Sequence, residues 1–429
     1  MGKNKTRSKS ALKQNSVTAE NKRLGDDGNI NFTFKILSAI GIIAEFNPLH
    51  TGHKYLLTEA RRHGTVIAAI SGNFVQRGEP AIVGKWARTE MALRCGADLV
   101  VELPVPYALS SAQFFAAGAV DLICKMSVVT YLSFGSETFG GEAGTAKLER
   151  FACRTLHGPE IDKVSLRKGH SYAAAARTSG SAAPNDILGA EYIRALRQQN
   201  SDIRPIAIER IGSEHDRPGS ARYIRNLMRD LDSPGDWDEL KSLLPQPAMN
   251  LLKREVESGR CPVLPEYFTQ AVFTSIRSLG AEGLRSCPFV GEGLEYKIYS
   301  AACSCTDLGA LVRECTSLRY TASRIRRILF AALLGIPHEM VRMPVPYIRI
   351  LGMNRGCGLL IDALKKCARV PVITSKAKFW KAAADLPESA PAKLFLQAEN
   401  RAADLYALGF PAEDQRTGYS ELTHPLIYV

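Results

Sequence analysis

The sequence lacks an apolar run long enough to cross a membrane. Its longest apolar stretches, such as residues 328–337, fall well short of the roughly 20 apolar residues that a membrane helix needs. It also has no internal repeat and, beyond the first 31 residues, no low-complexity tract. Hydrophobic residues make up 45% of the 429 residues and charged residues 23%, which excludes disordered, collagen-like and coiled-coil proteins. We therefore expect a globular, cytoplasmic protein with no membrane partner.

Cysteine pairs spaced for metal binding are also missing. The ten cysteines include no C-x-x-C pair, and Cys303 and Cys305 are too close for a usual zinc knuckle. Scattered cysteines in a chain of this size are typical of reduced, mostly buried thiols in a cytosolic protein. We expect neither a disulfide framework nor a bound structural metal.

Acidic residues are few relative to basic ones. Lys and Arg number 55 against 43 for Asp and Glu, a net charge of +12 that suggests a polyanionic partner. Residues 1–35 hold eight basic and three acidic residues without hydrophobic periodicity. We interpret this segment as a disordered basic tail, either a solvated extension or an aid in holding RNA. A signal peptide is disfavoured because no small-residue cleavage site follows the next apolar run.

Strand and helix patterns alternate over residues 36–232. Five short apolar runs are predicted as buried parallel strands: 39–45, 66–71, 98–103, 128–134 and 205–209. Helical patterns lie between and after them: 53–62, 85–95, 110–125, 186–198 and 221–230. This alternation predicts a doubly wound parallel α/β domain whose ligands lie beyond the carboxyl ends of the strands.

Two other regions depart from that alternation. Residues 140–184 carry many basic residues and no strand pattern, so we predict a largely helical insertion near the active face. Ser233-Pro234-Gly235 marks a break, after which helical patterns dominate. We therefore predict a second, α-rich domain over residues 236–429.

The strongest chemical signal is the segment 41–53, G-I-I-A-E-F-N-P-L-H-T-G-H. A strand runs into a turn, and H-x-G-H then opens a helix, where Gly52 lets a phosphate approach the free amides. His50 and His53 can face that spot and donate hydrogen bonds to phosphate oxygens during attack at phosphorus, as adenylyl transfer requires. The alternatives are turn residues with surface-capping histidines, or a zinc site that lacks a third ligand at a sensible spacing.

This segment resembles the H-x-G-H signature of the nucleotidyltransferase superfamily, which implies a Rossmann-like sheet. The wider chain resembles the bacterial tRNA(Met) cytidine acetate ligase family from about residue 39 to near its C-terminus. The matching strings are S-G-N-F-V-Q-R-G-E-P-A at 71–81, K-W-A-R at 85–88, D-L-V-V-E-L-P at 98–104, F-G-S-E at 134–137, P-N-D-I-L-G at 184–189, S-R-I-R-R at 323–327 and P-Y-I-R-I-L-G at 346–352.

The resemblance implies a ligase that converts acetate and ATP to acetyl adenylate and pyrophosphate. It would then acetylate the wobble cytidine of elongator tRNA(Met) to N4-acetylcytidine. ATP would be a substrate accompanied by Mg²⁺, and acetyl-CoA would not be needed. Acetate and tRNA are the implied partners, and no protein partner is evident.

The resemblance also assigns site residues. His50 and His53 would be catalytic. The ATP site would comprise Ile43, Ala44, Glu45, Phe46, Asn47, Pro48, Leu49, His50, Thr51, Gly52, His53, Lys54, Tyr55, Leu56, Gly135, Asn185, Arg210 and Ile211.

The distant members of this set have physical interpretations of their own. Gly135 follows a strand and would admit the adenine or ribose, or it is a plain turn glycine. Asn185 precedes a helix and could bind a nucleotide edge, cap the helix, or do both. Arg210 closes the fifth strand and would meet phosphate, or it is a surface charge.

One turn departs from the superfamily pattern. A Ser/Thr-rich turn after the last strand often grips phosphates, and here the corresponding turn is residues 219–225. Ser220 and Arg225 fit the pattern. Arg222 stands where a small hydroxyl residue is common, so the detailed phosphate contacts should differ.

The predicted RNA contacts rest on charge. Residues 316–376 hold eleven basic and two acidic residues, and Tyr347 could supply a base-stacking platform beside them. The alternative is a solvated basic face. With the family resemblance we favour tRNA binding by Arg324, Arg326, Arg327 and Arg349.

Two other functions remain open. The first is an adenylyltransferase acting on a small phosphorylated metabolite, which the extra α-rich half and the basic stretch argue against. The second is a non-catalytic RNA-binding protein on the same fold, which the intact His50, Gly52 and His53 argue against.

Overall fold

The computed structural model describes residues 39–156, 183–210, 219–231 and 233–429. The predicted basic tail, residues 157–182 of the basic insertion, and Ile211 lie outside the described residues. None of the helices in the described ranges is long and apolar enough to cross a membrane.

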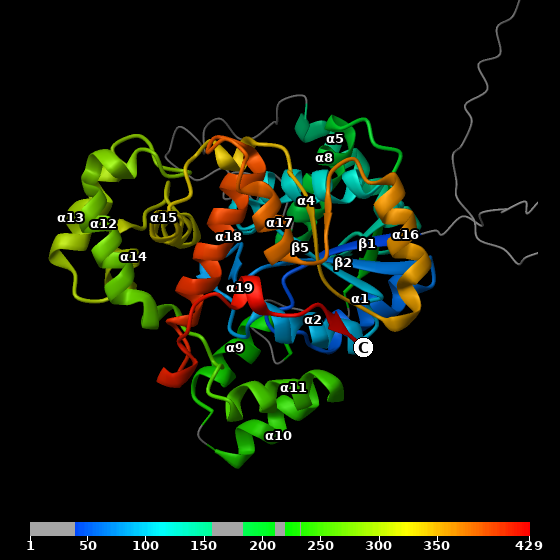
Figure 1. Cartoon of the computed structure of the whole chain (residues 1–429), viewed down its shortest axis with the longest axis horizontal. Helices are drawn as coiled ribbons and strands as arrows, with labels where there is room; N and C mark the ends of the chain where they lie inside the picture. The colour runs from blue at the N-terminus through cyan, green and yellow to red at the C-terminus, as the bar shows by residue number, and fades with distance from the viewer. Residues whose placement is uncertain (1–38, 157–182, 211–218, 232) are drawn as a thin grey trace, which may run out of the picture.

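A central sheet organises the molecule, with strand order β10-β8-β5-β2-β1-β6-β7 and β9 beside β8 (Figure 1). The five predicted strands are confirmed as β1 (Ala39–Ala44), β2 (Thr65–Ser71), β5 (Leu99–Leu103), β6 (Val129–Ser136) and β7 (Arg204–Glu209). They pair in parallel, and Ile42 of β1 lies opposite Ala68 of β2 and Ser133 of β6. The doubly wound α/β architecture is therefore confirmed.

Helices cover both faces of this sheet, which explains its unbroken apolar strands. Along β1, Ala39 and Ile43 join one hydrophobic cluster while Ile40 and Ile42 join the other. The first face packs against α4 (Ala112–Met126), α5 (Gly141–Leu156) and α8 (Pro184–Gln198). The second packs against α1 (Thr51–Arg61), α2 (Lys85–Arg94) and α9 (Ala221–Arg229).

The later half of the chain is mostly helical, as predicted. Below the sheet in Figure 1 lie α10 (Pro234–Leu243) and α11 (Gln246–Glu257), and a helical lobe to the left comprises α12 (Thr269–Leu284), α13 (Leu294–Ser304), α14 (Leu308–Cys315) and α15 (Ala322–Leu334). Further helices are α3 (Val105–Ala108), α16 (Gly358–Cys367), α17 (Lys376–Ala383), α18 (Pro391–Ala407) and α19 (Ser420–Thr423). Short 3-10 turns occur at Pro265–Phe268, Met340–Arg342, Arg355–Cys357 and Glu413–Gln415.

The prediction of a separate α-rich domain over 236–429 is wrong in one respect, because three strands of this half complete the sheet. β8 (Ile348–Met353) lies antiparallel to β5, and β9 (Val372–Ile373) and β10 (Ile427–Tyr428) lie parallel to β8. We did not predict β8 from the sequence because Pro344 and Pro346 shortly precede it and Arg349 interrupts its apolar run. A small hairpin, β3 (Phe74–Val75) and β4 (Glu79–Pro80), was also missed because its strands are so short.

A buried ion cluster connects this later half to the parallel strands of the sheet. Its members, all nearly inaccessible to solvent, are Lys85, Glu102, Arg349, Lys376, Glu399 and Glu421. The Lys85 ammonium lies 2.7 Å from Glu102, and Lys376 lies 3.0 Å from Glu399 and 2.9 Å from Glu421. Burial opposes the ionisation of Glu421, but Lys376, Lys85 and Arg349 hold its pKa well below the usual range.

This cluster corrects one predicted tRNA contact. The side chain of Arg349 is 3% exposed and lies 3.8 Å from Glu421, so it neutralises a buried carboxylate and does not face a solvent-borne phosphate. Tyr347 is fully buried too, which removes it as a base-stacking platform. The sequence shows the charge of Arg349 and the ring of Tyr347, but it does not show that Glu421, near the end of the chain, is buried beside Arg349.

Candidate active site

His50 and His53 begin helix α1 with a reciprocal pair of hydrogen bonds. His50 is the N-cap, and its Nδ1 accepts the Gly52 N–H at 3.1 Å. The Nδ1 of His53 accepts the His50 N–H at 3.3 Å. Because both Nδ1 atoms are acceptors, each neutral ring carries its proton on Nε2.

Both histidines are held neutral. Burial, aided by the positive charges of Arg210 and Arg225, lowers the pKa of His50 to about 3. Burial and the neighbouring His50 lower the pKa of His53 well below its ordinary value. The Nε2 of His50 is buried and has no partner among the described residues, so it is a donor available to a ligand oxygen.

Gly52 is needed by the histidine pair itself. A Cβ at this position would lie 3.0 Å from Cε1 and 3.2 Å from Nδ1 of His50, tighter than ordinary contact. The glycine therefore makes room for the capping imidazole, in addition to any close approach of a phosphate.

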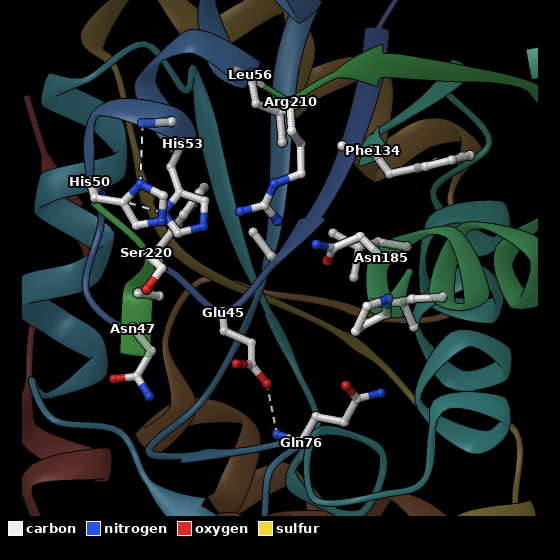
Figure 2. A pocket seen from close by; sticks show the side chains of 18 of the residues that line it. Glu45, Asn47, His50, His53, Leu56, Gln76, Phe134, Asn185, Arg210 and Ser220 are labelled. Atoms are coloured by element: carbon white, nitrogen blue, oxygen red, sulfur yellow. Dashed lines mark hydrogen bonds between the residues drawn. The ribbon is translucent and has the colours of Figure 1, made fainter. Parts of the chain in front are cut away.

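A cavity of about 240 Å³ opens at the carboxyl ends of β1, β6 and β7, where the α/β fold predicts a ligand (Figure 2). It brings together thirteen of the predicted ATP residues: Ile43, Ala44, Glu45, Phe46, Asn47, His50, Gly52, His53, Tyr55, Leu56, Gly135, Asn185 and Arg210. Four other predicted residues do not line it. Pro48 and Leu49 are buried in the turn, and Thr51 and Lys54 are exposed on α1.

Gly135 lies within β6, opposite Ile208 of β7, and is not a turn glycine. A Cβ on Gly135 would lie 3.0 Å from Cγ of Arg210. The missing side chain thus lets Arg210 cross the strand end, and Figure 2 shows its guanidinium between the histidines and Asn185. Arg210 is accordingly a cavity residue.

Asn185 lies in the first turn of α8 but is not its cap, because Ala183 holds that position. Its side-chain nitrogen donates to the Glu137 carboxylate, and the side chain lines the cavity. The capping interpretation is therefore wrong. Asn185 faces Arg210 across the cavity in Figure 2.

The turn before α9 contributes a second helix N-terminus. Ser220 caps α9 by accepting the Tyr223 N–H at 3.2 Å, and Arg225 donates to the Asn47 carbonyl oxygen at 2.8 Å. Ser220, Arg222 and Arg225 all line the cavity. Helix N-termini and arginines are suited to phosphate groups.

The charge of the cavity is positive overall. Its lining holds four arginines, Arg77, Arg210, Arg222 and Arg225, and two carboxylates, Glu45 and Glu209. The lining also includes five apolar or aromatic residues: Phe115, Phe134, Leu188, Tyr192 and Ile208. This combination suits a ligand with a flat apolar part and a polyanionic part.

Sequence reasoning missed Gln76 and Arg77 as cavity residues. They lie in the turn of the β3–β4 hairpin, and the Gln76 N–H donates to Glu45 at 2.8 Å. The string at 71–81 marked this turn through its family resemblance, but nothing in it indicated that the turn reaches the H-x-G-H helix.

Arg324, Arg326 and Arg327 all belong to α15, and their guanidinium groups bond to protein oxygens. Arg324 donates to the Phe289 carbonyl at 2.8 Å. Arg326 lies 3.1 Å from Glu79, and Arg327 donates to the Gln76 carbonyl at 3.0 Å. Their role in tRNA binding stays a prediction.

Comparisons with known proteins agree with this fold. A family model described as HIGH Nucleotidyl Transferase matches residues 37–421, so the chain is a nucleotidyltransferase of the H-x-G-H class. It is 35% identical to the tRNA(Met) cytidine acetate ligase of Acetivibrio thermocellus, over 91% of this chain and the whole of that protein. It is 36% identical to the protein of the same name from Caldanaerobacter subterraneus subsp. tengcongensis, over 80% of this chain and 90% of that one.

Solved structures give the same result. The crystal structure of Thermotoga maritima TmcAL bound with alpha-thio ATP is 32% identical, covers 91% of this chain and all of its own, and superposes with a TM-score of 0.81. Its apo form superposes with a TM-score of 0.82. The chain belongs to the tRNA(Met) cytidine acetate ligase family and is a ligase.

Proposed function

We propose that this ligase activates acetate with ATP and transfers the acetyl group to the wobble cytidine of elongator tRNA(Met), giving N4-acetylcytidine. The observation that carries the proposal is the neutral His50–His53 pair, which lines an arginine-rich cavity and in which the Nε2 of His50 is a buried donor without a partner among the described residues. The bound ATP analogue of the Thermotoga maritima structure supports ATP as the nucleotide.

In the first step, a carboxylate oxygen of acetate attacks the α-phosphorus of ATP and pyrophosphate leaves. The histidines donate to the phosphate oxygens as negative charge builds, and arginines neutralise the departing group. The protein supplies position and charge and forms no covalent intermediate. Mg²⁺ would accompany ATP, held largely by phosphate oxygens and water, with Glu45 and Glu209 as the lining carboxylates nearby.

In the second step, the exocyclic amine of cytidine attacks the acetyl carbonyl carbon and AMP leaves with the bonding electron pair. The amine loses one proton, and acetyl-CoA takes no part. A single-stranded anticodon base can be splayed from its loop, so a cytidine can reach a cavity at the strand ends.

Mass spectrometry of tRNA nucleosides tests this function. Incubation of the protein with unmodified elongator tRNA(Met), ATP and acetate should yield N4-acetylcytidine, and replacement of acetate by acetyl-CoA should not. Isotope-labelled acetate should carry its label into the nucleoside. Absence of the product with all substrates present would overturn the proposal.

A second assay separates the alternatives. ATP–pyrophosphate exchange that depends on acetate supports the ligase, whereas acetate-independent adenylylation of a phosphorylated metabolite supports the small-molecule adenylyltransferase. Failure to bind ATP in calorimetry would support a non-catalytic RNA-binding protein.

A further inference from the structure

The β3–β4 hairpin connects the helical lobe to the cavity. Its turn carries Gln76 and Arg77 into the cavity lining, while its other side rests on α15. Gly78 completes the turn with a φ of +77°, a conformation that favours glycine.

The hairpin packs closely against α15, through both backbone and side-chain contacts. A Cβ on Gly78 would lie 2.4 Å from the backbone nitrogen of Arg327, so only glycine allows this approach. Arg327 donates to the Gln76 carbonyl at 3.0 Å, and Arg326 pairs with Glu79 at 3.1 Å. Arginines at successive positions of one helix therefore hold both arms of the turn.

On the cavity side the same turn presents one unused donor group, the side-chain amide of Gln76. The backbone of Gln76 is anchored to Glu45, yet its side-chain nitrogen is buried without a partner among the described residues. Figure 2 shows this side chain turned away from the Glu45 bond, on the side of Asn185. A buried N–H group without an acceptor is costly, so a ligand oxygen is the expected partner.

Arg77 is exposed at the hairpin turn but lines the cavity, where it adds a positive charge to that of the half-buried Arg225. Burial lowers the pKa of Arg225, and Arg77 is the charge that lowers it most after burial. Separate contacts hold these two residues at the cavity: the Arg225 guanidinium donates to the Asn47 carbonyl, and the backbone carbonyl of Arg77 accepts from Arg326. Like charges kept close in a cavity favour an anion between them.

We propose that Gln76 and Arg77 bind the anionic reactants, and that Arg326 and Arg327 are positioning residues that hold this turn from α15. The ligand chemistry is a carboxylate or phosphate oxygen, supplied either by acetate or by ATP. The reaction assays rest on the proposed function, whereas the ATP-binding assay does not. This assignment replaces tRNA phosphate contact as the main role of Arg326 and Arg327.

The first test compares Arg77→Ala with Arg319→Ala, which removes the same charge from an exposed pair with Glu292 in the helical lobe. Arg77→Ala should weaken binding of ATP in calorimetry, or raise the KM for acetate in exchange, by about tenfold to a hundredfold, the scale for a lost charge-assisted hydrogen bond. Weaker ATP binding would identify the phosphates of ATP as the ligand of Arg77, and a raised KM for acetate would identify the acetate carboxylate. Arg77→Lys should recover part of the loss. Unchanged values for both substrates would overturn the proposal.

The second test asks whether Arg327 acts through the turn. Arg327→Ala should slow tRNA-independent exchange by about tenfold or more in the wild-type background and far less in a Gln76→Ala, Arg77→Ala background. Its tRNA affinity should match that of Arg319→Ala. Additive losses, or a loss confined to tRNA affinity, would overturn the positioning role.

Melting temperatures of the variants show whether each one folds, which the second test requires. If Arg327→Ala does not fold, Arg326→Ala makes the same comparison, since Arg326 is partly exposed and its loss leaves no buried gap. If the wild type shows no acetate-dependent exchange, the proposed function fails, and ATP affinity alone then decides whether Arg77 binds the nucleotide.

Discussion

The imidazole rings of His50 and His53 lie against each other at the start of α1, with ring centroids 3.8 Å apart. Each ring accepts a backbone N–H through Nδ1, so the helix terminus fixes which nitrogen of each ring carries the proton. The same two side chains therefore cap the helix through Nδ1 and carry their candidate catalytic protons on Nε2.

His53→Ala should lower acetate-dependent pyrophosphate release by about a hundredfold or more, the scale for losing one preorganised donor. ATP affinity should change far less, because the donor acts mainly as charge builds at phosphorus. His338→Ala, which removes an exposed histidine of the helical lobe, is the matched control. A His53→Ala enzyme with near-normal turnover would remove His53 from the mechanism.

The histidine pair should make the folded state less stable as pH falls. The pKa of His50 drops from 6.5 in the unfolded chain to about 3 in the folded one, so between these values only the unfolded chain takes up the proton. The stabilising contribution of His50 is fully present above pH 6.5 and declines by about 1.4 kcal/mol per pH unit between that pH and about 3, and His53 acts in the same direction.

Urea unfolding of His50→Asn at pH 5 and pH 7 checks this dependence. Asparagine is a favoured N-cap, so the helix keeps its cap while one titrating group is lost. The difference in unfolding free energy between the two pH values should shrink relative to the wild type. An equal difference in both proteins would show that His50 titrates normally when folded.

Gly52→Ala should reduce turnover with little effect on stability. The added Cβ would press on the His50 ring, and a displacement of the order of 1 Å at a reacting centre costs up to about a hundredfold. Gly358→Ala is the control, because that glycine also begins a helix but has open space around its Cα. Parallel kinetics and melting curves should separate the two, and equal activity in both variants would contradict the steric account.

Lys376→Met should destabilise the protein by about 3–5 kcal/mol, because it leaves Glu399 and Glu421 with an uncompensated buried charge. Adding Glu399→Met removes one negative charge as well and should restore much of the stability. Chemical unfolding of the single and double variants makes the comparison. A double variant less stable than the single one would mean that the pair itself, rather than charge balance, holds the cluster together.

The sequence predicted the first half of the fold well because its signals are local. Each central strand is an unbroken apolar run, and each lies between helices with a clear periodicity. The H-x-G-H segment could likewise be placed at a strand end, since Pro48 and Gly52 mark the turn and the helix start. The chemistry proposed for the histidine pair rests on that placement.

The rest depends on contacts between residues far apart in the chain. From the sequence, Arg327 and Arg349 are both predicted to be exposed basic residues. In the structure, Arg327 donates to the Gln76 carbonyl of the hairpin, whereas Arg349 pairs with the buried Glu421 carboxylate. Gln76 belongs to the cavity only because Glu45 and α15 hold its hairpin there. Composition shows that a charge exists, but only the fold shows which oxygen it meets.

The antiparallel pairing of β8 with β5 has a consequence for how the protein is made. Leu99 of β5 cannot pair with Met353 of β8 until most of the chain has left the ribosome, so this apolar edge of β5 stays exposed to solvent during synthesis. Such edges recruit other chains, and pairings this distant in sequence form slowly. Nascent chains should therefore depend on chaperones, and a fragment ending near residue 232 should accumulate as insoluble aggregates even though it contains the whole H-x-G-H segment.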